Sequence, residues 1–344
     1  MKLRVIHETV YHYSPAVQNA QHMAHLRPRT GVVQRVLTHS LQVDPAPTQC
    51  NMVQDVFGNT RTFFSLPFTH EQLRVCAESL LETLPVPAAP PGEPWEAVRE
   101  RLSYRRGQPY HAATEFSFAS PYIPRHADFV AYAAESFAPG RPLMQAASHL
   151  MSRIHADFAY TANATDAGTP ALESLRLRRG VCQDFAHVMI GCLRSLGLAA
   201  RYVSGYLLTE PPPGQPRLVG ADASHAWVSV WSPSADDRDS ALDENAWFDL
   251  DPTNDRPAGE DYVTLAIGRD FSDVSPLRGV IHGGDHHVLQ VGVTVEPLAE
   301  ATAAGAAAAE LTASDAPPHT AAGTRKSRLI RAPRSFTRSR NWVR

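Results

Sequence analysis

The residue best suited to covalent chemistry is Cys182, which lies two positions after Gly180 in the segment RGVCQDFAH. The apolar pattern that follows predicts a helix that begins at this point. Free backbone N–H groups and the positive end of the helix dipole stabilise an anion there, so they lower the pKa of a thiol. Cys182 is therefore a candidate nucleophile. The alternative is a buried structural cysteine, because cysteine is one of the residue types most often buried.

A thiol that performs acyl transfer needs an imidazole within hydrogen-bond reach and a third group that holds the imidazole. His187 lies five residues along the same predicted helix, about 140° around its axis from Cys182, so it cannot face the thiol. We expect His187 to be a packed or a surface histidine. His225 opens a predicted strand in SHAWVSVW, where a sheet can present it to the helix start. His225 is therefore the predicted base.

The third group is expected on a neighbouring strand. The segment WFDLDPTN contains Asp249 and Asp251, whose spacing directs both side chains to the same face of a strand. Spacing therefore does not choose between them. Asp251 precedes a proline, which favours an extended backbone and places it at the strand end, although Asp-Pro is also a common turn.

The elements that carry these residues follow a change of pattern near residue 85. Residues 1–84 hold short alternating apolar stretches separated by prolines, which predicts an antiparallel β domain. Five prolines in PVPAAPPGEP make residues 85–94 the predicted linker. Residues 298–344 are Ala-rich, then Pro/Thr/Ser-rich and then basic. They have too few large apolar side chains to offset the entropy of ordering, so disorder is expected.

Residues 95–297 are predicted to form helices followed by strands. Apolar residues recur every three or four positions from Leu143 to Ile154, and again over residues 181–196 before Gly197, a residue typical of a helix C-terminus. The stretches RYVSGYLLT, HAWVSVW and AWFDLD then read as strands. The predicted fold class is α+β, with a helix that bears the cysteine packed on an antiparallel sheet that bears the histidine and the aspartate.

Composition excludes several classes of function. Eight of the 32 basic residues lie after residue 324, and the preceding chain has a net charge of −11, which disfavours nucleic acid as the main partner. The four cysteines form no C-x-x-C pair, which favours a reducing compartment. No apolar run is long enough to span a membrane, and the N-terminus lacks the apolar core of a signal peptide. We expect a soluble cytoplasmic protein without a membrane partner.

Cofactor and metal sites are not predicted. The glycines form no phosphate-binding fingerprint. The segment IHGGDHHV contains metal-ligand residue types, but adjacent histidines on a strand face opposite ways, so a loop is the preferred interpretation. Cys192 lies on the apolar stripe of its predicted helix and is expected to be inert. The residues considered in IHGGDHHV are His282, Asp285, His286 and His287.

Three segments together resemble a known family. GVCQDFAH, SHAWVSVW and WFDLDPTN, in this order, are similar to the cysteine, histidine and aspartate motifs of the transglutaminase-like cysteine peptidase superfamily. IHETVYHYSPAVQNAQHMAHLRPR resembles the β domain that precedes the core in bacterial members, and IGRDFSDVSPLRGVIHGG resembles their closing segment. The resemblance covers roughly residues 1–297 and implies a papain/transglutaminase-like core.

The resemblance also implies roles. Cys182 would be the nucleophile, His225 the general base and later acid, and Asp251, rather than Asp249, the residue that orients the imidazole. The implied reaction is attack on a peptide or carboxamide carbonyl of a peptide or protein substrate, which gives a thioester that water or an amine resolves. No cofactor is implied. The backbone N–H of Cys182 would supply one oxyanion donor.

Other roles and functions stay open at this point. Tyr160, Asp184 and Trp227 are further candidates for the pocket wall; Tyr160 is alternatively a core tyrosine, and the default role of Asp184 is to stabilise the helix start. Two alternatives to hydrolysis are cross-linking of glutamine to an amine, which would use the same triad, and a non-catalytic binding scaffold. The sequence does not indicate the oligomeric state.

Overall fold

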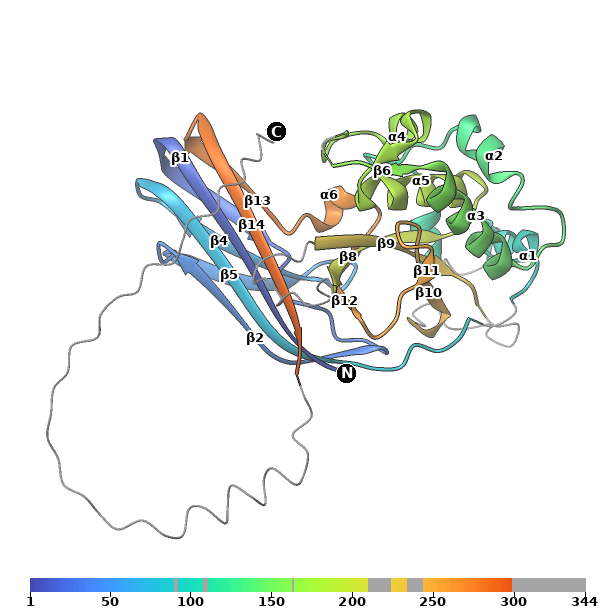
Figure 1. The fold of residues 1–344 in the computed structure, drawn as a ribbon, viewed down its shortest axis with the longest axis horizontal. Coiled ribbons are helices and arrows are strands. Elements are labelled where there is room, and N and C mark those ends of the chain that lie inside the picture. Colours follow the sequence, from blue (N-terminus) through green and yellow to red (C-terminus); the bar gives the residue numbers. More distant parts are fainter. Residues whose placement is uncertain (90–91, 108–110, 163, 210–223, 234–243, 299–344) are drawn as a thin grey trace, which may run out of the picture.

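The computed structural model describes residues 1–89, 92–107, 111–162, 164–209, 224–233 and 244–298. These residues form two parts, an extended sheet and a helical region built on a second sheet, which lie side by side in Figure 1. The predicted tail, residues 298–344, falls outside the described residues except for Leu298.

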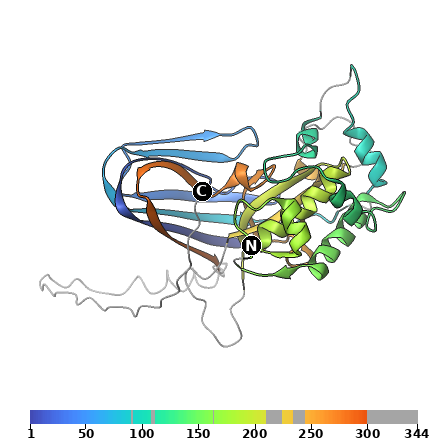
Figure 2. The ribbon, with the colours of Figure 1, turned by 90° about the horizontal axis from the view of Figure 1, so that it is seen from above.

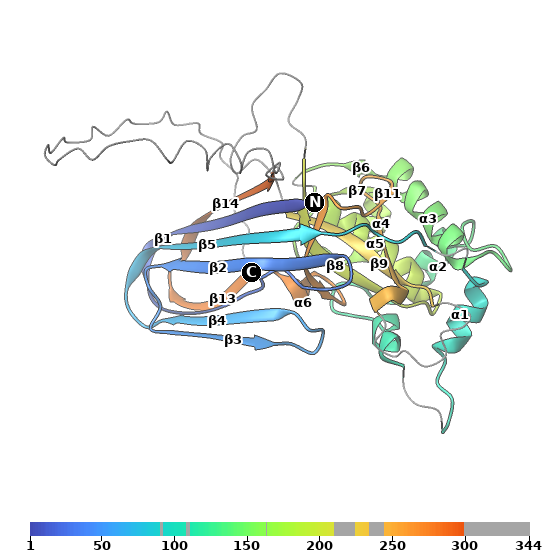
Figure 3. The same ribbon diagram turned by 90° about the horizontal axis from the view of Figure 1, so that it is seen from below.

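The first part is a seven-stranded antiparallel sheet in which β1 is the central strand. Its N-terminal half pairs with β5 on one side and β14 on the other, and its C-terminal half pairs with β4 and β13. Figure 3 shows β1, β5 and β2 running next to one another. The strands are β1 (Lys2–Ala24), β2 (Gln34–Asp44), β3 (Gln49–Gln54), β4 (Thr60–Leu66), β5 (His70–Thr83), β13 (Leu277–Gly283) and β14 (His286–Pro297).

Alternation along these strands explains the sheet. In β1 the buried residues Leu3, Val5 and His7 alternate with half-buried ones, as expected for a strand with one face on a core. The pairing of β1 with β5 shifts between His12 and Val17, so the strand changes its neighbours there. Side chains from β1, β4 and β5 then form a core of their own under this domain.

The predicted C-terminal limit of the second domain is wrong. Residues 95–297 were expected to form one core, but β13 and β14 pair with β1 of the N-terminal sheet. Figure 2 shows these orange strands among the blue ones, away from the helices. The physical reason is that β1 has two edges and β5 covers only one along its first half, so residues 277–297 return to pair with the other. The helical part therefore ends near residue 276.

The second part has a five-stranded antiparallel sheet of order β11-β10-β9-β8-β12, with α5 packed on β9 and β8. Helices α2, α3 and α4 contact α5 in turn, so α5 lies at the centre of the largest core. The helices are α1 (Trp95–Arg101), η1 (Ala112–Ser117), α2 (Ala127–Ala133), α3 (Leu143–Asp157), α4 (Ala171–Leu177), α5 (Cys182–Ser195), η2 (Glu244–Ala246) and α6 (Phe271–Val274). The strands are β6 (Ala159–Tyr160), β7 (Arg179–Gly180), β8 (Ala200–Leu207), β9 (Ser224–Trp231), β10 (Trp247–Asp251), β11 (Arg256–Pro257) and β12 (Tyr262–Gly268).

The central helix begins and ends where its sequence indicates. Gly197 has a φ of 84°, and its N–H bonds to the carbonyl of Arg194, while the N–H of Leu198 bonds to the carbonyl of Leu193. This is a Schellman ending, which needs a residue tolerant of positive φ. Between its ends almost every residue of α5 is buried. The helix start is therefore held rigidly against the sheet.

The two parts share an apolar interface and a hydrogen-bonded edge. Leu3, Val5 and Val295 of the N-terminal domain pack with Tyr206 and Val263 of the second sheet. Across the free edge of β12, two side-chain amides take the place of a further strand, because each one bonds to both the N–H and the C=O of one β12 residue. Gln34 bonds to Thr264 at 2.8 and 2.9 Å, and Asn59 bonds to Ile267 at 2.9 and 2.7 Å.

Among the described residues, no helix combines the length and the apolar character needed to cross a bilayer.

Candidate active site

Cys182 is the first residue of α5, and a buried carboxylate fixes the backbone beneath it. Asp184 is 1% exposed; its Oδ2 accepts hydrogen bonds from the Val181 N–H (2.8 Å) and the Thr165 hydroxyl (2.6 Å). Its Oδ1 accepts one from the Ser174 hydroxyl (2.7 Å). Asp184 therefore stabilises the helix start and does not line an open pocket. The Cys182 side chain above it is partly exposed.

The strand register brings His225 and Asp251 together. His225 is the second residue of β9 and Asp251 the last of β10, and these two strands are antiparallel neighbours. Because Leu250 pairs with Val228, Asp251 lies diagonally across from His225 on the same face. The imidazole Nε2 is 2.7 Å from Oδ2 of Asp251.

Asp251 is a fully buried carboxylate surrounded by donors. Its Oδ2 also accepts hydrogen bonds from the Tyr262 hydroxyl and from Nδ2 of Asn254, each at 2.7 Å. Its Oδ1 accepts from the backbone N–H of Thr253 at 2.8 Å and of Asn254 at 3.3 Å. Burial raises the pKa of the Asp251 carboxyl, but the bonds from His225, Asn254 and Tyr262 outweigh it and hold that pKa below its usual range. The residue is therefore ionised at neutral pH.

The Cys182 thiol lies close enough to the His225 imidazole to help raise the pKa of that ring. Because Nε2 points to Asp251, the ring presents Nδ1 to the sulfur. Burial lowers the pKa of His225, but the hydrogen bonds to Asp251 and Cys182, together with the negative charges of both groups, raise it to about 10. The arrangement therefore favours an imidazolium that faces both the Cys182 sulfur and the Asp251 carboxylate.

Asp249 has a different partner, although it lies on the same face as Asp251. Its Oδ2 accepts a hydrogen bond of 2.9 Å from the indole Nε1 of Trp227, its diagonal neighbour. Trp227 is fully buried and its ring packs edge-on against Tyr262 at 5.2 Å. The register of β10 against β9, which residue spacing alone did not reveal, therefore brings Asp249 to Trp227 and Asp251 to His225. Trp227 supports the site from behind and does not form an open pocket wall.

Two further predicted residues have clear positions. His187 is fully buried on the other side of α5, where its Nε2 accepts the N–H of Phe271 at 3.2 Å, so it is the packed histidine that helix geometry indicates. Tyr160 is 61% exposed, and its ring centroid is 6.3 Å from that of Phe185. Partial burial and the charge of Cys182 both raise the pKa of Tyr160, which pairs in register with Gly180, two residues before Cys182. Tyr160 is therefore at the surface of the site and is not a core tyrosine.

Sequence reasoning missed two residues of this cluster. Asn254 lies in the quoted segment WFDLDPTN, and the tendency of an Asp side chain to bond to backbone N–H groups two and three residues ahead could have indicated it. Tyr262 had no such signal, because it lies 11 residues beyond Asp251 and reaches the site from a strand at the opposite edge of the sheet.

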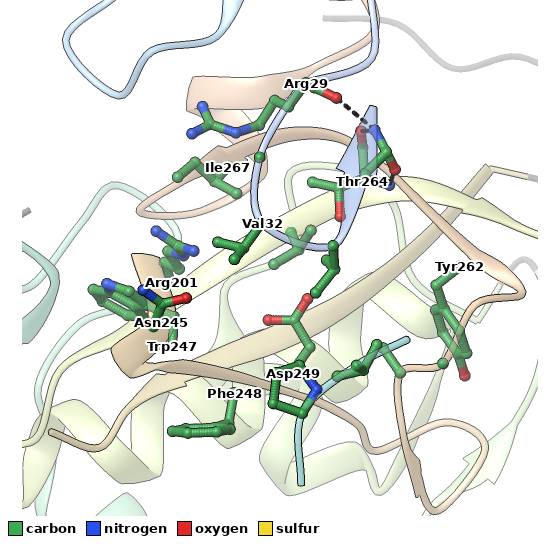
Figure 4. Close-up of a pocket in the computed structure, with 18 of the residues that line it drawn as sticks. Arg29, Val32, Arg201, Asn245, Trp247, Phe248, Asp249, Tyr262, Thr264 and Ile267 are labelled. Carbon is green, nitrogen blue, oxygen red and sulfur yellow. Dashed lines mark hydrogen bonds between the residues drawn. The ribbon is translucent and has the colours of Figure 1, made fainter. Parts of the chain in front are cut away.

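A separate pocket of about 130 Å³ lies between the two domains (Figure 4). Arg29 and Val32 of the N-terminal domain face Trp247, Phe248 and Asp249 of β10 across it. Tyr262 lies at its border, but Cys182, His225 and Asp251 do not line it. The pocket therefore lies behind the cluster and is not an entrance to the thiol.

The described residues contain no group of three or more histidine, cysteine or carboxylate side chains arranged to hold a metal ion. His282 lies one residue before the end of β13, and His286 and His287 are the first two residues of β14. The His287 ring packs against Tyr11 at 5.7 Å. All four cysteines are free thiols, and burial raises the pKa of Cys192.

Comparison with known proteins identifies the family. Residues 3–82 match the model of the bacterial transglutaminase-like N-terminal region, and residues 130–252 match that of the transglutaminase-like superfamily. An uncharacterized protein of Mycobacterium bovis is 41% identical over 305 residues, which cover 86% of this chain and 93% of that protein. The chain belongs to the transglutaminase-like superfamily. An uncharacterized protein of Mycobacterium leprae is 30% identical over 87% of the chain and 99% of its own length.

Two further relatives of this transglutaminase-like chain have more specific names. A protein-glutamine gamma-glutamyltransferase of Pseudomonas aeruginosa is 33% identical over 119 residues, which are 34% of this chain and 16% of that enzyme. The solved structure named "Putative Cysteine Protease" from Cytophaga hutchinsonii has a TM-score of 0.65 at 18% identity and covers 88% of this chain and 92% of its own. This likeness supports the fold, an N-terminal antiparallel sheet domain followed by a transglutaminase-like core.

Proposed function

We propose that the protein is a cysteine-dependent hydrolase of amide or peptide bonds, with Cys182 as nucleophile, His225 as acid and base, and Asp251 as the group that orients His225. One observation carries this proposal: the imidazole joins the Cys182 thiol to a buried, ionised carboxylate. A nucleophile beside a base that is itself held by an acidic group is suited to acyl transfer.

In the first half of the reaction the Cys182 thiolate attacks the amide carbonyl carbon. A C–S bond forms and the carbonyl oxygen becomes an oxyanion. When the oxyanion collapses, the C–N bond breaks, and the His225 imidazolium gives its proton to the leaving amine. A high His225 pKa suits this step, because the proton remains on the ring until the amine needs it. The products are a free amine and a thioester on Cys182.

In the second half a water molecule attacks the thioester, and His225, now neutral, accepts a proton from that water. The C–O bond forms, the C–S bond breaks, and the carboxylic acid product leaves while the thiolate and imidazolium return. The backbone N–H of Cys182, at the first position of α5 where no partner exists within the helix, can donate to the oxyanion in both halves.

The test uses a library of peptide amides with a fluorescent leaving amine. We expect wild-type protein to release the fluorophore, and Cys182→Ala to lose at least about 1000-fold in rate, the scale typical of a removed nucleophile. Cys50→Ala is the matched control, because it removes an exposed thiol of the N-terminal domain and should keep full activity. Full activity of Cys182→Ala would overturn the proposal.

A second outcome of the same thioester is transfer to an amine. The similarity to the Pseudomonas aeruginosa protein-glutamine gamma-glutamyltransferase, which spans part of the core, favours testing it. Incubation of a glutamine-containing peptide with labelled cadaverine separates the reactions. Label in the peptide means transfer, whereas conversion of glutamine to glutamate without label means hydrolysis, which is the outcome we propose.

A further inference from the structure

The oxygen of Asp251 that holds His225 is shared with a tyrosine from the opposite edge of the sheet. Tyr262 is 5% exposed and its hydroxyl lies 2.7 Å from Oδ2, the same distance as Nε2 of His225. An ionised carboxylate only accepts hydrogen bonds, so the phenol is the donor. Burial and the charge of Asp251 both raise the pKa of Tyr262, so its proton stays on the phenol.

Two neighbours pack against the Tyr262 ring, and the strand that carries it is held nearby. Trp227 packs edge-on against it, with ring centroids 5.2 Å apart, and the Arg256 guanidinium lies over the ring at 4.7 Å from its centroid. Arg256 is itself paired with Asp261. Two residues further along β12, Thr264 is held at both its N–H and C=O by Gln34 of the N-terminal domain. The hydroxyl therefore reaches Asp251 from a support that cannot easily rotate.

We propose that Tyr262 is a positioning residue, which fixes the orientation of the Asp251 carboxylate and stabilises its negative charge. The inference rests on the proposed function, because it assigns Asp251 to the support of His225. It extends that function by making the catalytic geometry depend on a residue outside the three motifs.

The Tyr262 hydrogen bond affects both the orientation and the charge of the Asp251 carboxylate. A carboxylate can rotate about its Cα–Cβ and Cβ–Cγ bonds, and a second strong donor on Oδ2 restricts that rotation so that the oxygen stays aimed at His225. The same bond stabilises the ionised form, so its removal raises the pKa of Asp251. Protonation of Asp251 would take away the counter-charge of the imidazolium, and alkylation of the neighbouring Cys182 would then fall off at a higher pH.

Other groups that face this network also contribute to its titration. On the thiol side lie Tyr160 of β6 and Tyr202 of β8, whose pKa values both respond to the charge of Cys182. On the carboxylate side lie Asp249 of β10, the Arg256–Asp261 pair and Asn254. None of these is altered in the substitution below, so a change in the pH profile reports the lost phenol hydroxyl.

The experiment measures how fast iodoacetamide alkylates Cys182 as a function of pH, by mass spectrometry of the peptide that contains it. In Tyr262→Phe we expect the acidic limb of this profile to move up by roughly one pH unit, the usual effect of one hydrogen bond to an ionised group. The exposed Cys50 provides an internal reference in the same sample, since its rate should not change. An unchanged acidic limb in folded Tyr262→Phe would overturn the proposal.

Tyr206→Phe is the matched control. Tyr206 is also buried and its hydroxyl also makes one side-chain bond, 2.9 Å to Nδ1 of His7, but it does not touch Asp251. Its acidic limb should match that of wild type even if its stability falls; a shift as large as that of Tyr262→Phe would assign the effect to domain packing and overturn the proposal.

A second variant covers the case in which Tyr262→Phe does not fold. Site-specific replacement of Tyr262 by 3-fluorotyrosine keeps the hydroxyl and makes it a stronger donor, so the acidic limb should move to lower pH. A shift to higher pH, or none, would contradict the proposal. Alkylation needs no substrate, so its pH profile tests the role of Tyr262 even if the peptide screen detects no hydrolysis. A shifted acidic limb together with a failed screen would count against the proposed hydrolysis and not against the role of Tyr262.

Discussion

At the scale of single residues, the orientation and pKa of His225 depend on Asp251, and the charge of Asp251 depends on its own hydrogen-bond donors. Asp251 accepts five hydrogen bonds while fully buried, and only one comes from His225. A buried carboxylate without such donors would be protonated and could not pair with an imidazolium. The four other donors therefore keep Asp251 ionised, so that it can pair with the His225 imidazolium.

The residue-scale prediction concerns the pKa of His225. In Asp251→Asn the negative charge and the acceptor oxygen are lost while burial remains, so the pKa should fall from about 10 toward or below the ordinary value of about 6.5. The folded-state pKa is raised, so the interaction stabilises the protein fully below about pH 6.5 and is lost as the pH rises through about 10. NMR titration of the ring protons, assigned with His225→Gln, measures it. An unchanged midpoint in Asp251→Asn would contradict this account.

At the scale of elements, the antiparallel order β10-β9-β8-β12 decides which side chains meet. His225 on β9 pairs in register with Gly205 on β8, and Gly205 pairs with Thr264 on β12. A Cβ at Gly205 would lie 2.1 Å from the carbonyl oxygen of Val263 and 2.5 Å from the Trp227 ring. The backbone of β12 can therefore approach β8 closely only because residue 205 has no side chain.

The element-scale prediction follows from that close approach. Gly205→Ala must push β12 away from β8 or displace Trp227, so the free energy of unfolding should fall by about 1–3 kcal/mol or more, as for other overpacked sites. Gly31→Ala is the matched control, since its added Cβ meets no atom within 4 Å and should leave stability unchanged. Urea denaturation followed by circular dichroism measures both. Equal stability of the two variants would show that the sheet can relax at no cost.

At the scale of the whole molecule, the N-terminal domain is part of the support of the site. The amides of Gln34 and Asn59 complete the free edge of β12, and an apolar cluster joins the two sheets beside them. Both amide residues are nearly or fully buried. Loss of either one leaves the backbone N–H and C=O of a β12 residue without these partners, a cost that a surface amide does not carry.

The molecule-scale prediction is that a substitution in the N-terminal domain destabilises the second domain. Asn59→Ala should lower the free energy of unfolding by about 1–3 kcal/mol. Tryptophan fluorescence should report the loss, because the described tryptophans, Trp95, Trp227, Trp231 and Trp247, all lie in the second part. Gln72→Ala, which removes an exposed amide of β5, should have no effect. A fluorescence transition unmoved by Asn59→Ala would mean that the domains unfold independently.

The sequence by itself determined the local features: the start of α5 at Cys182, the ending at Gly197, the β character of residues 1–84, and three motifs whose resemblance implied the family. These depend on apolar periodicity, on helix-end chemistry and on residues close together in the chain. The motif resemblance implied Asp251 as the partner of His225, but tertiary structure alone decided the register that joins them, that Tyr262 shares the same oxygen, and that β13 and β14 return to β1. Strand register and edge pairing join residues far apart in the chain, and side-chain alternation is the same for any register two residues apart, so no local pattern could specify them.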